Sequence, residues 1–166
     1  GKPYPAAAPW FPNAPGLSTE LLPGGVNGYP YSLKALVLWS SHPMYGIPGL
    51  RARLAKDLAD PAKLPLIISV DPFINESNAF ADYIVPDSLM YESWGWVAAW
   101  NGVPTKSMGA RWPVIEPQAQ KTAEGRPIGM ETFFIALAKA MGLPGFGEAA
   151  ITDTEGNVIA WSSAGG

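Results

Sequence analysis

The chain has 166 residues and a formal net charge of −3, so it offers no basic footprint for nucleic acid. It contains no cysteine, which excludes disulfides, thiolate nucleophiles and iron–sulfur ligation by these residues. Charged residues make up only 15% of it, well below the usual share of roughly a quarter. We therefore expect other protein to cover part of the surface. The chain begins at Gly1, with no initiator methionine or signal peptide, and we interpret it as a piece of a larger protein.

Prolines dominate the start of the chain. Five fall within the first 15 residues, which is too dense for a helix or a central strand. Aromatic side chains are interleaved with them. We predict that residues 1–30 form an extended Pro-rich arm whose aromatics hold it to a neighbouring surface, with a binding loop as the alternative. The pairs Gly24-Gly25 and Asn27-Gly28 are typical of turns.

A strand–helix–strand pattern follows the arm. Continuous apolarity over Leu33–Trp39 predicts a strand buried on both faces. An apolar stripe beginning at Ile47 then predicts an amphipathic helix to about residue 59, with Pro48 in its first turn. Leu64–Val70 reads as the next strand. Together these elements predict a βαβ unit with parallel strands.

A third apolar run, Asp82–Pro86, predicts another parallel strand. Its link, residues 73–81, is short and has room for only one or two helical turns. Because parallel strands end at the same edge of a sheet, Ser41-His42-Pro43, Asp71 and Asp87 should become neighbours there. Open α/β sheets bind their ligands at such an edge.

The second half of the chain is irregular and aromatic up to residue 128. Asn101-Gly102 suggests a hairpin turn between residues 97–100 and 103–105. Helical spacing of apolar residues predicts a helix over 129–141, ended by Gly142. Residues 149–152 and 158–161 read as a C-terminal β-hairpin. We predict a single domain over 1–166, with a 1–30 arm, a 31–143 α/β core and a 144–166 loop and hairpin.

The polar residues at the predicted edge are candidates for chemistry. His42 is the only histidine, and without cysteine it has few partners for a zinc site. Ser41 lies beside it, but no nucleophile-elbow motif is present. Asp71 and Asp87 have the residue type of a general acid–base pair, and equally suit hydrogen bonds to ribose hydroxyls or a guanine edge. Asp82 precedes its strand and reads as structural.

Several motifs carry a family resemblance. The stretch VDPFINESNAFADYIVPDSLMYES resembles a segment of molybdopterin oxidoreductases of the dimethyl-sulfoxide-reductase type. Lys34–Leu38 before a proline-ended loop, and the run Arg111–Pro117, resemble further segments of that family. The resemblance covers roughly residues 26–143. The positions that match the first stretch are Asp71, Phe73, Ser77, Ala81, Asp82, Pro86 and Glu92.

Within the family, Asn27–Tyr31 and the Pro-rich insert are most similar to tetrathionate reductase catalytic subunits. Arsenate and thiosulfate/polysulfide reductase subunits are the alternatives. The resemblance implies an enzyme of anaerobic respiration that reduces tetrathionate to thiosulfate. It also implies a periplasmic, membrane-associated complex with a membrane anchor subunit, together with an iron–sulfur electron-transfer subunit. This chain alone would be an inactive fragment packed against other domains of its own subunit.

The resemblance also implies the cofactors. The full-length protein would carry molybdenum bis(molybdopterin guanine dinucleotide), with a [4Fe-4S] cluster outside this fragment. The chain would be a Rossmann-like α/β domain that holds the guanosine end of one dinucleotide. Its implied contacts are Ser41, His42, Pro43, Gly46, Val70, Asp71 and Asp87. The family often has an acid or an asparagine where His42 stands. A free-standing α/β ligand-binding domain remains the alternative.

Overall fold

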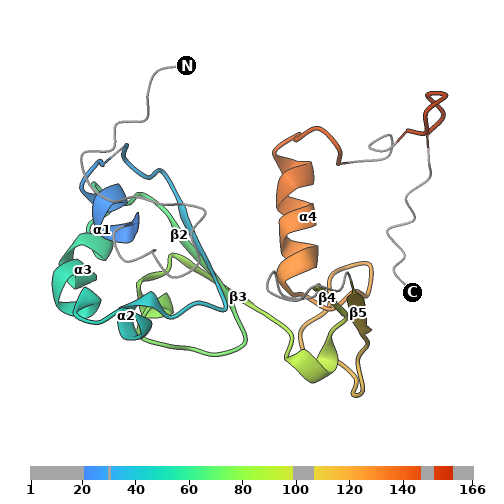
Figure 1. The fold of residues 1–166 in the computed structure, drawn as a ribbon, viewed down its shortest axis with the longest axis horizontal. Helices are drawn as coiled ribbons and strands as arrows, with labels where there is room; N and C mark the ends of the chain where they lie inside the picture. The colour runs from blue at the N-terminus through green and yellow to red at the C-terminus, as the bar shows by residue number, and fades with distance from the viewer. Residues whose placement is uncertain (1–20, 30, 99–106, 147–151, 159–166) are drawn as a thin grey trace. The chain divides into compact units, whose positions relative to one another are not determined.

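The structure is a computed structural model that describes residues 21–29, 31–98, 107–146 and 152–158 (Figure 1). By their contacts the residues divide into two compact units, 1–89 (unit 1) and 90–166 (unit 2). Most of the predicted Pro-rich arm lies outside the described residues. The predicted boundaries of arm, core and C-terminal hairpin stay a prediction.

Unit 1 contains a three-stranded parallel sheet in the order β1-β2-β3. Trp39 pairs with Val70, and Asp71 pairs with Pro86, so the three strands end together. The predicted βαβ unit and third parallel strand are confirmed. A single turn of 3-10 helix at Asn78–Phe80 lies in the short link before β3, as expected. The strands are β1 (Leu36–Trp39), β2 (Ile67–Asp71) and β3 (Tyr83–Pro86).

Two helices of unit 1 follow the first strand. A single turn, α2 (Pro43–Gly46), comes directly after β1, and α3 (Leu50–Leu58) forms the crossover to β2. The crossover helix begins later than predicted, because Gly49 has a φ of 73° and Ile47 is extended. A left-handed residue interrupts helical hydrogen bonding, so Pro48 lies before the helix and not in its first turn.

The helix α1 (Leu21–Val26) corrects the expectation of extended backbone up to residue 30. Gly24 and Gly25 lie inside this helix and do not form the expected turn. Leu22 and Val26, one helical turn apart, are both buried in the hydrophobic core. Burial of these two side chains outweighs the poor helix propensity of the glycines.

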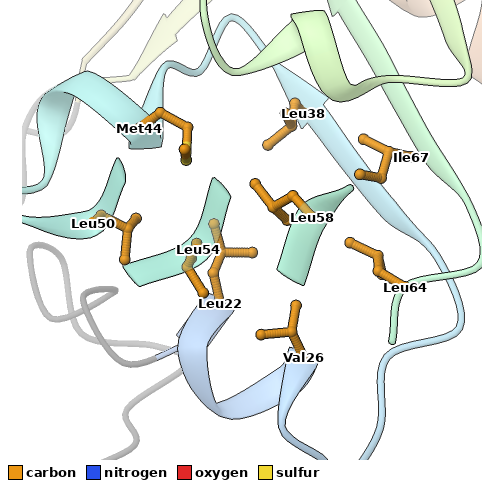
Figure 2. Close-up of a cluster of buried hydrophobic side chains, with 9 residues drawn as sticks. All are labelled: Leu22, Val26, Leu38, Met44, Leu50, Leu54, Leu58, Leu64 and Ile67. Atoms are coloured by element: carbon orange, nitrogen blue, oxygen red, sulfur yellow. The ribbon is translucent and has the colours of Figure 1, made fainter. Parts of the chain in front are cut away.

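The hydrophobic core of unit 1 lies between its helices and one face of the sheet (Figure 2). In the figure, side chains from all three helices converge on Leu38 of β1 and Ile67 of β2. On the other face of β1, Val37 and Trp39 are exposed. The prediction that β1 is buried on both faces is therefore wrong for this chain, whereas every residue of β2 is buried. The core residues are Leu22, Val26, Leu38, Met44, Leu50, Leu54, Leu58, Leu64 and Ile67.

Gly25 is required by a close approach of Leu33. A Cβ at position 25 would lie 2.4 Å from Leu33 Cδ1. Gly25→Ala is therefore expected to lower the free energy of unfolding of unit 1 by about 2 kcal/mol. The measurement is the rate of hydrogen exchange of the α1 and α3 amides, which should rise. Gly46→Ala is the matched control, because a Cβ there meets nothing within 4 Å and should cause no such change. Equal effects of the two substitutions would contradict this packing.

Unit 2 contains an antiparallel pair, β4 (Gly95–Ala98) and β5 (Met108–Arg111), and the helix α4 (Met130–Ala140). The two strands confirm a hairpin, but β5 begins later than the predicted second strand. The predicted turn at Asn101-Gly102 lies outside the described residues. In the part of the chain that the structure describes, no helix is long and apolar enough to cross a membrane.

The bounds of helix α4 match the predicted ones, because a capping motif lies at each of its ends. The Thr132 hydroxyl accepts the N–H of Gly129 at 2.9 Å, which satisfies a donor at the N-terminus. At the C-terminus Gly142 has a φ of 65°. The N–H groups of Gly142 and Leu143 bond back to the carbonyls of Lys139 and Ala138, the pattern of a Schellman motif.

A tight turn closes the described part of the chain. Thr152 and Val158 form an antiparallel bridge, and the rest of the two predicted strands lies outside the described residues. The Asp153 carboxylate accepts bonds from the Asn157 side chain and from the backbone N–H groups of Asn157 and Glu155. These bonds favour its ionised form and lower the pKa of Asp153. A hydrogen bond from the Thr122 hydroxyl likewise lowers the pKa of Glu124.

Candidate functional site at the strand-end edge

The carboxyl ends of β1, β2 and β3 form one edge, which we call the strand-end edge (residues 40–46, 71–80 and 87–88). Backbone pairing extends one residue beyond the strands: the Ser40 N–H donates to the Val70 carbonyl at 3.0 Å, and the Asp87 N–H donates to the Asp71 carbonyl at 3.3 Å. The structure therefore brings together the three loops that the sequence predicted to be neighbours.

The loop after β1 turns sharply away from the sheet. Ser40 has a φ of 42°, a conformation that non-glycine residues rarely adopt. Ser41 and His42 follow, both half-buried, and Pro43 begins α2. The His42 ring stacks on Tyr45, with centroids 5.5 Å apart and planes 18° from parallel. Within the described part of the chain, the buried His42 Nε2 has no hydrogen-bond partner.

The loop after β2 is braced by Asp71. Its Oδ1 accepts the Phe73 N–H at 2.9 Å, and its Oδ2 lies 3.4 Å from the Asn75 side-chain nitrogen. Only 9% of Asp71 is exposed. Its carboxylate therefore has a structural role in its own loop, and only Oδ2, with its long bond, retains much capacity to accept from a ligand.

Two asparagines complete the bracing of this loop. The Asn75 Oδ1 accepts the N–H groups of Ser77 and Asn78 at 2.9 and 3.0 Å. The fully buried Asn78 accepts the Asn75 N–H at 2.7 Å and donates to the Phe73 carbonyl at 2.8 Å. These reciprocal bonds hold the loop tip, where Phe73 and Ile74 are 65% and 74% exposed.

The loops after β1 and β2 are joined to each other. The buried Ser77 hydroxyl accepts the Met44 N–H of α2 at 3.0 Å, and Arg51 of α3 pairs with Glu76 at 2.9 Å. The run Asn75-Glu76-Ser77 has the pattern of a glycosylation acceptor, but its asparagine and serine are both engaged internally. From the sequence, Asn78 reads as an ordinary loop residue. The pattern that could have indicated its role is an aspartate and two asparagines at short spacing, which is typical of Asx-turns.

Asp87, after β3, links the two outer strands. The Trp39 indole N–H donates to Asp87 Oδ2 at 3.0 Å, and the Ser88 N–H donates to Asp87 Oδ1 at 2.9 Å. Trp39 belongs to β1, so this bond crosses the end of the central strand. Asp87 is half-buried, and a carboxylate offers about four acceptor positions in all. The sequence did not mark Trp39 as part of this edge, because the residue reads as the end of a buried strand.

The remaining predicted contacts have limited means of reaching a ligand. Val70 is fully buried, so it can act only through its backbone, and its carbonyl already accepts the Ser40 N–H. The Gly46 N–H donates to the His42 carbonyl at 2.8 Å, but its Cα faces open space. Pro43 is half-buried at the start of α2.

The opposite edge of the sheet has a different character. Asp82 accepts the Ile67 N–H at 2.8 Å and so joins the starts of β2 and β3, which fits the structural interpretation of this residue. A shallow cavity of about 340 Å³ lies beside it, lined by Leu58, Ala59, Pro61, Leu64, Ile67, Phe80 and Asp82. Among the described residues, no group of three or more side chains has the make-up of a metal site.

Three relatives match nearly the whole chain. It is 54% identical over 157 residues to a tetrathionate reductase subunit of Salmonella typhimurium, a match that covers 95% of this chain. It is 36% identical to a selenate reductase subunit of Mesobacillus selenatarsenatis, covering 87% of the chain. It is 33% identical to a tetrathionate reductase subunit of Archaeoglobus fulgidus, covering 90%. No protein-family profile matches the chain. No solved structure matches it.

The matched relatives are far longer than this chain, which covers 15% of the Salmonella protein and 14% of each of the other two. The match nevertheless runs through both units, and two of the three relatives are the same subunit of tetrathionate reductases. The chain is therefore a fragment homologous to that tetrathionate reductase subunit, and it belongs to the dimethyl-sulfoxide-reductase family of molybdoenzymes.

Proposed function

We propose that the chain is part of the catalytic subunit of a molybdenum-dependent tetrathionate reductase, and that its strand-end edge holds the guanosine end of one molybdopterin guanine dinucleotide. The observation that carries the reductase assignment is the 54% identity to a tetrathionate reductase over 95% of the chain. The selenate reductase is the second candidate, and its lower identity of 36% ranks it behind. In this proposal unit 1 is a Rossmann-like domain.

The chemistry of the edge fits a guanine nucleotide. Guanine presents N–H donors on its pairing edge, so it needs acceptors, and the half-buried Asp87 is a carboxylate with about four acceptor positions. The buried His42 Nε2 has no partner among the described residues, and a ligand atom beside it would satisfy its hydrogen bond. Asp71 fits less well, because its carboxylate is buried and braces its own loop.

When bound, the molybdenum cofactor would supply the two electrons that split the central sulfur–sulfur bond of tetrathionate and give two thiosulfates. The residues of this chain would bind and orient the cofactor. The residues of this edge that would hold the nucleotide are Ser41, His42, Pro43, Gly46, Val70 through its backbone, Asp71 and Asp87. The [4Fe-4S] cluster would be held by the rest of the subunit, since this chain has no cysteine, and we place the protein ligand of the molybdenum there as well.

The setting of the full-length protein is also part of this proposal. Each relative is named as one subunit of its enzyme, which supports a complex of several subunits. We place in it a membrane anchor subunit, together with an iron–sulfur electron-transfer subunit, on the periplasmic side of the membrane. Residues beyond this chain would supply the other domains of the same subunit.

Asp87→Asn in the full-length subunit tests the edge. The side-chain amide of asparagine has an NH2 donor in place of one carboxylate oxygen, and this donor cannot accept the N–H groups of guanine. A lost charge-assisted bond corresponds to about tenfold weaker retention. We expect the guanine nucleotide bound per polypeptide, measured as GMP released by acid after dialysis, to fall accordingly. Asp87 is preferred to Asp71 because Asp71→Asn would also loosen the loop.

The matched control is Asp82→Asn, at the other end of the same strand. Its carboxylate accepts the Ile67 N–H far from the strand-end edge, so stability should fall while GMP per folded subunit stays unchanged. Equal loss of GMP from both variants would show a general effect on the fold. Unchanged GMP in Asp87→Asn would remove the strand-end edge from the cofactor site while leaving the reductase assignment in place.

A further inference from the structure

The described residues of unit 2 form almost no hydrophobic core. Among its described residues Ala138 is the one buried hydrophobic side chain, whereas unit 1 has a cluster of nine. Unit 2 instead exposes many large apolar side chains. They are Met90, Tyr91, Trp94, Trp96, Val97, Met108, Trp112, Val114, Ile115, Ile135, Met141, Leu143, Phe146 and Val158. Protein surfaces rarely leave so much apolar area in water unless another surface covers it.

One face of the β4–β5 hairpin gathers this apolar surface. Trp96 pairs with Ala110, and Ala98 pairs with Met108. Side chains alternate along a strand, so these four residues share one face, which we call the ribbon face. Trp96 and Met108 on it are 77% and 70% exposed. The other two residues are alanines, and none of the four is charged.

A polar side chain covers one end of the opposite face of the hairpin. The Arg111 guanidinium lies over Gly95, where a Cβ would be 2.8 Å from Nη2. It donates to the Ser93 carbonyl at 3.3 Å and to the Ser93 hydroxyl at 3.1 Å. Arg111 therefore covers the Gly95 end of this face, whereas Val97 on the same face is 61% exposed. The ribbon face is the face without a charged residue.

The covering surface must form together with the subunit itself. A two-stranded ribbon is at best marginally stable in water without a third layer. A partner that joins later would leave the ribbon unsupported while the subunit folds. The relatives extend over six to seven times the length of this chain, since it covers only 14–15% of them. That length supplies enough chain to cover the ribbon, and the lack of charge matches the core of a permanent interface.

We propose that the ribbon face docks against a segment of the same subunit that lies outside these 166 residues, through an apolar surface that receives Trp96 and Met108. The proposal does not depend on the cofactor-holding role of unit 1. Under this proposal, unit 2 is stable only when it packs against the rest of the subunit.

Photo-cross-linking in the full-length, assembled complex tests this directly. Trp96→p-benzoylphenylalanine and Met108→p-benzoylphenylalanine each place a photoreactive ring on the ribbon face. We expect both to cross-link, on irradiation, to one peptide of the same subunit outside the 166-residue segment, identified by mass spectrometry. Glu124→p-benzoylphenylalanine is the control, because Glu124 is exposed in a polar turn and should give no cross-link to that peptide.

Three results would overturn the proposal. A cross-link to a different subunit assigns the ribbon face to the interface between subunits. A cross-link confined to the 166 residues means that the chain covers its own ribbon. Absence of a cross-link from both positions means that the face is left in water. As a second measurement, hydroxyl-radical oxidation of Trp96 and Met108 should be at least tenfold slower in the folded subunit, purified alone, than in the urea-unfolded subunit.

Discussion

Replacing Asn78 with alanine is expected to release the loop after β2 from the sheet. Asn78 is fully buried, and its side chain satisfies the Asn75 N–H and the Phe73 carbonyl. Alanine would leave both backbone groups, which are partly buried, without these partners, at about 1–1.5 kcal/mol for each lost bond. We expect a loss of about 3 kcal/mol of local stability, which corresponds to roughly hundredfold faster hydrogen exchange of the amides in residues 73–79.

The same substitution should also weaken cofactor retention if the strand-end edge holds a nucleotide, because this loop forms one of its sides. Glu76→Gln is the matched control. Glu76 lies in the same loop, but its exposed pair with Arg51 contributes little to stability. Its exchange rates should stay within about twofold of the parent, a change of ~0.4 kcal/mol. An Asn78→Ala variant with unchanged exchange would contradict the bracing role of the asparagines.

The second large effect is expected from Leu54→Ala in α3. Leu54 is 1% exposed and lies in the core between the helices and the sheet (Figure 2). Truncation removes buried methyl groups and leaves a cavity, at a usual cost of about 2–5 kcal/mol. We expect the urea concentration at the unfolding midpoint of unit 1 to fall accordingly. The midpoint is measured from the hydrogen-exchange protection of the β2 amides at increasing urea concentration.

Lys56→Ala on the same helix is the control for Leu54→Ala. Lys56 is exposed, and alanine has a slightly better helix propensity, so the free energy of unfolding should change by less than about 0.5 kcal/mol. If Leu54→Ala caused a similarly small change, the cluster of nine residues would not be the core that stabilises unit 1.

The elements that the sequence predicted best are those whose pattern is local. Helix α4 was found within one residue at each end, because its apolar spacing is regular and Gly142 ends it. The parallel order of the three strands also followed from short apolar runs separated by a helix and by a short link. In both cases the decisive information lies within a few residues of the element itself.

The errors arose where tertiary packing overrides local preference. Leu33 belongs to the predicted first strand, but its side chain packs on Gly25 and its N–H bonds to the Gly25 carbonyl, so β1 starts later. The same contact accounts for helix α1 in a segment that reads as a turn. No local pattern marks these residues as partners.

The candidate site was predictable in its location but not in its internal bonds. Topology alone placed His42, Asp71 and Asp87 at one edge, and the structure brings them together. The indole of Trp39 on Asp87 and the burial of Asp71 depend on side-chain directions that spacing does not specify. Their contact with a nucleotide stays a prediction until the Asp87→Asn experiment is done.

The uneven distribution of the core between the two units has a consequence for biogenesis. During synthesis, residues up to 89 can collapse as soon as they leave the ribosome, because their hydrophobic cluster is complete within them. Unit 2 has no such cluster among its described residues, so under the docking proposed above its ribbon face stays exposed until the segment that covers it is present. In that interval its apolar surface is exposed to aggregation, so this part of the nascent subunit is where we expect a chaperone to bind.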